Sequence, residues 1–136
     1  MSFYTRRIYE LHDAKISKIE VTNNRTALIE FEHIAVHYEI SDNKYDIWSN
    51  NFVIILIGVN SIEMIGSFDK GDYISDGNIK TRDNKELVMF GLNELLNSNK
   101  IELMYSNGCT VTISYNGSKL IKESRIEKIE EWDGPL

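Results

Sequence analysis

The first regular hydrophobic pattern along the chain has a period of two, which is typical of strands that bury one face. Residues 16–21 and 27–31 are rich in β-branched and other apolar side chains, and the turn-forming pair Asn23-Asn24 lies between them. We therefore predict a β-hairpin near the start of the chain.

The apolar positions change parity after this hairpin. They are odd-numbered up to Phe31 and even-numbered from Ile34 to Tyr38. Because successive side chains of a strand point to opposite faces, both runs can share one buried face only if an extra residue is inserted between them. We predict a bulge at Glu32-His33 and a bend of the sheet at this point.

The next segments divide into polar and apolar blocks. Residues 41–51 are polar apart from a few side chains that include Tyr45 and Trp48, and we expect an exposed connection with an aromatic tip. Residues 52–59 are apolar at successive positions, which predicts a strand covered on both faces at the centre of the sheet. Residues 61–68 are expected to prolong that strand after an irregularity.

A loop and a helix are expected next. Residues 69–82 are rich in glycine and aspartate, a composition typical of a loop. Residues 83–97 fit a helix that begins at an Asp83 cap, with Glu86 at the position of a capping box. The apolar side chains of this helix share one face: Leu87, Phe90, Leu92, Leu95 and Leu96. Gly91 inside it weakens the helix by about 1 kcal/mol relative to alanine.

The register of the hairpin over residues 101–115 follows from its apolar positions. A two-residue turn at Asn107-Gly108 would place the apolar side chains of the two strands on opposite faces. A three-residue loop, Ser106-Asn107-Gly108, instead aligns Leu103 with Val111, and its glycine supplies the left-handed conformation that such loops need. We predict the three-residue loop.

The final segment can be interpreted as a strand or as a helix. A tight turn at Asn116-Gly117 is expected to bring Leu120 opposite Ile113 and complete a three-stranded meander. The residues with helical spacing are Ile126, Ile129 and Trp132. On a helix, however, Glu123 and the glutamates that follow it at intervals of four would stack like charges, which is destabilising. We therefore favour a strand over residues 119–132.

Length and composition limit the class of protein. The 136 residues, of which 42% are hydrophobic and 26% charged, suit one globular domain over residues 1–136. We predict an α+β fold with a curved, mainly antiparallel, strand-rich sheet and one helix, and partial closure toward a barrel is left open. The longest apolar run has eight residues, too few for a membrane span, and the N-terminus has no apolar leader. With Cys109 as the single cysteine, we expect the protein in the cytoplasm.

The charge balance indicates the chemistry of a partner. The net charge of −6 and the isoelectric point near 5.1 argue against nucleic-acid binding and favour a basic protein as partner. Aromatic and acidic side chains on the two predicted loops are the candidate contacts: Tyr45, Trp48, Asp69, Asp72, Tyr73 and Asp76. The alternative is that Trp48 and Trp132 cap the ends of the core.

The candidate catalytic and metal-binding residues do not form a recognisable site. His33 and His37 would share a strand face only without the predicted bulge, and zinc needs at least three converging ligands. The neighbours His12 and Asp13 would point to opposite sides of an extended chain. Cys109 lies outside any nucleophile motif. We therefore predict a protein without a metal site, without a cofactor and without catalytic residues.

Two short motifs carry a resemblance to a known class of proteins. One is Leu11-His12-Asp13-Ala14 followed by Ile16, Ile19 and a hairpin, and the other is the terminal stretch over residues 131–136, EWDGPL. With these motifs the chain resembles small bacterial immunity-type proteins of polymorphic toxin systems. The resemblance implies a non-catalytic cytoplasmic protein that neutralises a cognate toxin through loops such as residues 41–51 and 69–82.

Two other classes of function remain open. A bent sheet could enclose a small apolar molecule against the helix, which would make the protein a ligand-binding module. An exposed strand edge, for which the hairpin over residues 101–115 is the candidate, could instead pair with a second copy to form a homodimer.

Overall fold

The computed structural model describes residues 6–22, 24–66 and 73–136. Strands make up 76% of it, arranged in two antiparallel sheets that do not close into a barrel, and one short helix accompanies them. The predicted α+β class with a mainly antiparallel, strand-rich architecture is therefore confirmed.

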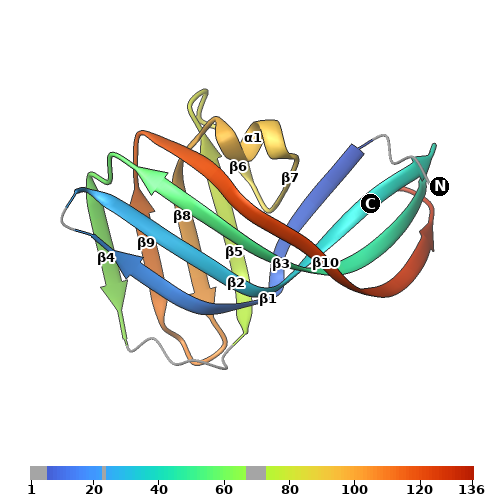
Figure 1. The fold of residues 1–136 in the computed structure, drawn as a ribbon, viewed down its shortest axis with the longest axis horizontal. Helices are drawn as coiled ribbons and strands as arrows, with labels where there is room; N and C mark the ends of the chain where they lie inside the picture. Colours follow the sequence, from blue (N-terminus) through green and yellow to red (C-terminus); the bar gives the residue numbers. More distant parts are fainter. Residues whose placement is uncertain (1–5, 23, 67–72) are drawn as a thin grey trace.

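Each sheet has five strands. The elements are β1 (Arg6–Val21), β2 (Thr26–Ser41), β3 (Lys44–Ile57), β4 (Ser61–Ile65), β5 (Ile74–Thr81), β6 (Glu86–Leu87), β7 (Met89–Phe90), α1 (Leu92–Leu96), β8 (Ser98–Tyr105), β9 (Thr110–Ser114) and β10 (Gly117–Asp133). The first sheet has the order β10-β3-β2-β1-β7 and the second the order β4-β9-β8-β5-β6. The strands of the two sheets run across one another, as in orthogonally packed sandwiches (Figure 1).

The hydrophobic core lies between the two sheets. Its largest fully buried side chains include Tyr9, Phe31 and Phe52 of the first sheet and Tyr105 of the second. The four long strands continue past the second sheet as a twisted ribbon, on the right of Figure 1. This ribbon, called the extension below, consists of residues 6–10 of β1, 34–41 of β2, 44–50 of β3 and 124–133 of β10.

The predicted bulge in β2 is confirmed. Phe31 pairs with Phe52 and Ile34 pairs with Asn50, so Glu32 and His33 lie opposite the single residue Asn51. The Asn51 side-chain amide donates to the Glu32 carbonyl oxygen at 2.7 Å. Phe31 and Ile34 are each only 1% exposed, so the extra residue keeps both apolar runs in the core.

Both predicted hairpins are present, and the register predicted for the second is confirmed. In the first, Val21 pairs with Ala27. In the second, Leu103 pairs with Val111, and the Tyr105 amide donates to the Cys109 carbonyl oxygen at 2.8 Å across the three-residue loop. Gly108 has φ +90°, the left-handed conformation that the loop requires.

The predicted exposed connection over residues 41–51 is wrong. The chain turns at residues 42–43 and β3 begins at Lys44, so most of this segment is strand. Tyr45 is only 4% exposed, and the polar residues Asp46 and Asn50 are also buried. The Asp46 carboxylate forms an ion pair with Lys128 at 3.2 Å. The Asn50 side-chain amide donates to the Tyr38 hydroxyl at 2.8 Å. A polar composition is compatible with a buried strand here because neighbouring strands supply partners.

The predicted loop over residues 69–82 is wrong in its described part. Residues 74–81 form β5, and Ile74 and Ile79 are fully buried. A side chain at Gly77 would put a Cβ 3.1 Å from the Glu102 carbonyl oxygen and 3.3 Å from Leu11, so this glycine marks close packing rather than a loop.

The predicted helix over residues 83–97 is reduced to α1, residues 92–96. Leu87 pairs with Ile79 and Phe90 pairs with Tyr9, so tertiary strand pairing replaces the first half of the helix. The Gly91 amide then caps α1 by donating to the Glu94 carboxylate at 2.8 Å. In the described part of the chain, no helix is long and apolar enough to cross a membrane.

The end of the chain is a strand, as favoured, but its predicted pairing is wrong. After Asn116 the chain crosses to the first sheet, where Leu120 lies opposite Ile54 of β3 instead of Ile113. The predicted meander is therefore broken at this crossing. β8 and β9 are interior strands, so the hairpin over residues 101–115 is not an exposed edge.

The apolar run over residues 52–59 also differs from its prediction. It contributes to β3, which lies between β2 and β10, whereas β2 is the middle strand of the sheet. Ile57 is 39% exposed, so the outer face is incompletely covered. At Gly58 the chain leaves this sheet, and the strand expected to prolong it becomes β4 of the second sheet.

The bulge gives a direct test of the fold. Deleting His33 removes the extra residue, so the apolar side chains after it would exchange faces, and we expect loss of the cooperative urea transition. His33→Ala keeps the residue count and removes the hydrogen bond to Ser49 Oγ, and we expect it to lower the free energy of unfolding by about 1 kcal/mol. Equal stability of the two variants would contradict this role of the bulge.

Candidate functional site

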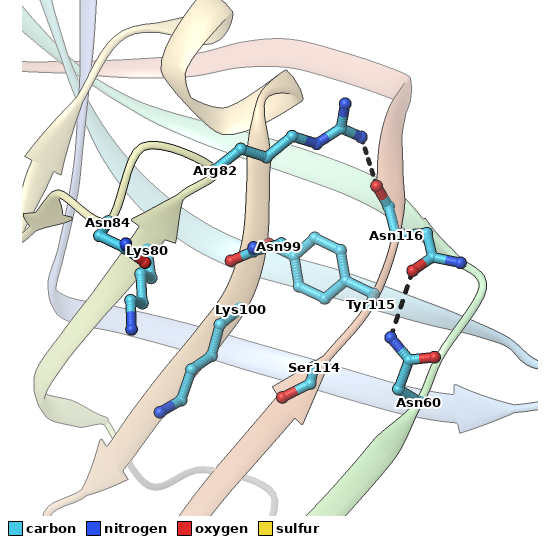
Figure 2. A pocket seen from close by; sticks show the side chains of 9 residues that line it. All are labelled: Asn60, Lys80, Arg82, Asn84, Asn99, Lys100, Ser114, Tyr115 and Asn116. Atoms are coloured by element: carbon cyan, nitrogen blue, oxygen red, sulfur yellow. Dashed lines mark hydrogen bonds between the residues drawn. The ribbon is translucent and has the colours of Figure 1, made fainter.

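A polar pocket lies at the corner of the sandwich, where the chain passes from one sheet to the other. Its walls come from the crossing between β3 and β4, the crossing between β9 and β10, the end of β5 and the start of β8. Figure 2 shows its side chains. The cavity has a volume of about 520 Å³ and is lined by three basic side chains, four asparagines, one serine and one tyrosine.

The basic side chains are brought together by strand register. Lys80 of β5 lies directly opposite Lys100 of β8, and both are half-buried. Arg82 follows at the end of β5. Like charges directly opposite one another destabilise a sheet. In this acidic chain, the pocket concentrates positive charge and has no carboxylate in its lining.

Two carboxylates flank the lysines, and neither is within ion-pair distance of them. Glu86 pairs with Lys80 on the other side of β5, and Glu102 follows Lys100 on the same face of β8. Among the ion pairs of residues 6–22, 24–66 and 73–136, none involves either lysine. The two ammonium groups therefore remain available to an anion.

Amide groups complete the walls. Arg82 donates from its guanidinium to the Asn116 carbonyl oxygen, and Asn60 donates to the Asn116 side-chain oxygen at 3.2 Å (Figure 2). The Asn99 carbonyl oxygen accepts from the Tyr115 amide at 2.9 Å, which ties β8 to the crossing segment. Asn84 stands in a turn with φ +66°. These contacts place several amide side chains around one opening.

The floor of the pocket is the buried ring of Tyr115, which is 2% exposed. Its hydroxyl hydrogen-bonds with Ser98 Oγ, which in turn donates to the Leu95 carbonyl oxygen. Burial raises the pKa of Tyr115 to about 12, although the hydrogen bond with Ser98 opposes this shift. The floor therefore stays neutral at physiological pH and adds no negative charge.

A second polar cluster lies around Glu123, where the extension joins the sandwich. Its carboxylate accepts from Arg7 at 2.7 Å, from Tyr9 at 2.9 Å and from Asn50 at 2.8 Å. Burial raises the pKa of Tyr9 above its usual range, with a further contribution from the charge of Glu123. Because Glu123 is engaged from three sides by this chain, we interpret the cluster as structural.

Each histidine is held by a different partner. His12 Nδ1 lies 2.7 Å from the Ser75 carbonyl oxygen, and His37 Nε2 lies 2.9 Å from a Glu10 carboxylate oxygen. The hydrogen bond from His37 lowers the pKa of Glu10. Within the described ranges, no three histidine, cysteine or acidic side chains are grouped as metal ligands. Cys109 is buried.

The residues predicted to contact a partner fall on separate elements. Tyr45 is buried in β3, where its hydroxyl donates to Glu39 at 3.1 Å. Trp48 is half-buried beneath the Arg125 guanidinium, 5.3 Å from the ring centroid. Both lie in the extension, not on an exposed loop.

Of the other predicted contact residues, Tyr73 and Asp76 lie at the start of β5. Tyr73 is 50% exposed, with Lys15 Nζ 5.7 Å from its ring centroid. Asp76 is exposed, and its carboxylate accepts from the Gly77 amide at 2.9 Å. Asp69 and Asp72 lie outside the described residues, so their predicted role stays a prediction.

The sequence reasoning missed the polar pocket. Lys80 lies in the segment predicted as a loop, and Lys100 directly precedes the predicted hairpin over residues 101–115. Their proximity depends on the β5–β8 register, which appears only after β5 is recognised as a strand. The sequence feature that could have indicated the pocket is the presence of asparagines at residues 97, 99 and 116. Asparagine is also common in turns, so this feature does not distinguish a pocket from a turn.

Comparison of the chain with protein-family models, with curated proteins and with solved structures gives no match. What the fold defines is an α+β protein with two crossed antiparallel sheets and a basic pocket at their corner.

The buried floor of the pocket predicts a loss of stability at alkaline pH. Because the pKa of Tyr115 is raised in the folded state, its contribution is complete below the unfolded pKa of about 10 and is lost as pH rises toward about 12. In Tyr115→Phe, we expect the free energy of unfolding to fall less at alkaline pH than in the wild type, by on the order of 2 kcal/mol. At neutral pH, we expect its free energy of unfolding to be lower than that of the wild type by about 1 kcal/mol, because the hydrogen bond is lost. Urea denaturation from neutral to alkaline pH measures both effects, with Tyr73→Phe as the exposed control. An unchanged slope in Tyr115→Phe would contradict the assignment.

Proposed function

We propose that this protein is a non-catalytic binding protein whose corner pocket takes a small anionic ligand with several hydrogen-bonding groups. A phosphorylated sugar has this chemistry. The observation that carries the proposal is the pair Lys80 and Lys100, which lie opposite one another beside Arg82 and form no ion pair with another described residue. A dianion between these groups would convert a repulsive arrangement into an attractive one.

The rest of the lining supports a polar ligand. The asparagine amides offer both donors and acceptors, as a ligand with hydroxyl groups requires. The volume of about 520 Å³ lies within the range of small-molecule sites. The walls are strand ends and short crossings rather than long loops, which reduces the entropy lost on binding.

The electrostatics favour local recognition over long-range attraction. The whole chain carries a net charge of −6, so its distant field repels anions. The lysine pair acts over a few ångströms, where the half-buried setting screens it less than bulk solvent would. Binding is therefore expected to weaken with salt.

The repulsion between the lysines predicts opposite effects on stability and on binding. Lys100→Ser is expected to raise the free energy of unfolding of the ligand-free protein by about 0.2–1 kcal/mol, because it removes the like-charge neighbour of Lys80. Lys80→Ser also removes the opposite-charge neighbour of Glu86, so its free energy of unfolding is expected to change less. Each substitution is expected to weaken binding of glucose 6-phosphate roughly tenfold. Urea denaturation and titration calorimetry measure the two quantities.

The controls separate charge from general effects. Lys44→Ser removes an exposed lysine outside the pocket and should leave binding unchanged. Glucose lacks the phosphate and should bind far more weakly than glucose 6-phosphate. Equal affinity of both pocket variants and the wild type for the phosphate ester would contradict the proposal.

A basic protein partner in the cytoplasm, as in an immunity protein, is the second candidate function. The exposure of Tyr73 and Asp76 at the start of β5 and the acidic charge balance favour it. The test is binding of a cationic protein that copurifies from the source cells. Tyr73→Ala and Asp76→Lys should weaken that complex, whereas Lys80→Ser should not. Unchanged binding in both variants would reject this surface.

A further inference from the structure

β10 is a long edge strand whose outer side is open. It runs from the corner of the sandwich to the tip of the extension and pairs on one side with β3 (Figure 1). Near its start, Ser118 Oγ donates to the Leu95 carbonyl oxygen of α1 at 3.0 Å. Beyond that point, the other side of β10 has no strand partner within the described ranges.

This edge carries three bulges, and the extra residue at each of them is an isoleucine. Ile121, Ile126 and Ile129 each lie between two β10 residues that pair with consecutive residues of β3. These isoleucines are 53%, 56% and 49% exposed, and Trp132 near the end of the strand is 45% exposed. Bulges commonly protect an edge against unspecific strand pairing, but protection alone does not require exposed apolar side chains.

Some charged residues of β10 are engaged within the chain. Glu123 binds Arg7, Arg125 lies over the rings of Tyr38 and Trp48, and Lys128 binds Asp46. These contacts fasten β10 to the rest of the extension, so these charges are already used.

Apart from Asp133 at the C-terminal end of the strand, the charged residues of β10 that form no ion pair or ring contact with another described residue have a simple order along it. Lys119 and Lys122 lie in its first half, and Glu127 and Glu130 lie in its second half. In the pairing with β3, all four occupy the face opposite to Leu120, which packs against the core. The open edge is thus basic at one end and acidic at the other.

We propose that β10 binds β10 of a second copy, antiparallel about a two-fold axis, to form a homodimer. An antiparallel arrangement places the basic half of each strand beside the acidic half of the other, so the same ion pairs form twice. The bulged isoleucines and Trp132 would lie along the shared edge and lose their exposure to water. A parallel arrangement would instead bring like charges together.

The bulges also determine the character of this dimer. They interrupt regular backbone pairing, so the contact depends mainly on side chains. A contact of this kind is expected to be concentration-dependent and to weaken as salt screens its ion pairs. It does not depend on the corner pocket, because none of the four charged residues lines that pocket.

The test is a charge exchange followed by sedimentation equilibrium of the full chain. The wild type is expected to dimerise, with the dissociation constant rising at high salt. Glu127→Lys with Glu130→Lys makes the edge basic throughout, and Lys119→Glu with Lys122→Glu makes it acidic, so each double variant should be monomeric. An equimolar mixture of the two should form a heterodimer, and the chain with all four changes should dimerise again.

A matched control and the contrary results complete the test. Glu20→Lys with Glu63→Lys changes the net charge as much as the basic edge variant does, at exposed sites on β1 and β4, and should leave the dimer intact. A monomeric wild type at all concentrations would overturn the proposal, as would dimers that survive both edge variants. Circular dichroism of each variant establishes that a monomer is folded.

Discussion

The fold depends on one irregularity, the position in β2 where two residues face one. The first apolar run of β2 ends at Phe31 in the core of the sandwich, and the second begins at Ile34 on the same side. Without Glu32 and His33 opposite Asn51, the second run would face solvent and the extension would expose its apolar side. The bulge therefore allows β2 and β3 to form part of the sandwich along one half of their length and part of the extension along the other half.

The extension has no second sheet to cover it, and a polar cluster takes over part of that role. Arg7 of β1 and Glu123 of β10 come within 2.7 Å although β2 and β3 lie between their strands. Three strand spacings amount to roughly 14 Å in a flat sheet, so the contact requires long side chains and a sheet curved toward this face. The Arg7 side chain is partly exposed, and an ion pair of this kind adds little net stability by itself. Its effect here is geometric, because it fixes the curvature that brings Tyr9, Asn50 and Glu123 together.

The sequence predicted those features of the fold that depend on residues close together along the chain. The three-residue hairpin loop followed from matching Leu103 to Val111, and the bulge followed from parity, because both depend only on neighbouring residues. The strand nature of β10 followed from like-charge spacing. The polar start of β3 and the glycine-containing β5 were missed because their partners are distant in sequence, as with Asp46 and Lys128. The pocket was missed for the same reason, since Lys80 and Lys100 meet only through register.

The pocket is positioned by the tight crossing of two segments that change sheets. Gly58 has φ +67°, and a Cβ at this position would lie 2.6 Å from the Asn116 side-chain nitrogen. Glycine is therefore required both by the backbone conformation and by the closeness of the other crossing. The Asn116 amide donates to the Ile57 carbonyl oxygen at 2.9 Å, and the Asn116 carbonyl oxygen accepts from Arg82. One asparagine thus joins both crossings and the end of β5, so the Arg82 guanidinium is held in place before any ligand arrives.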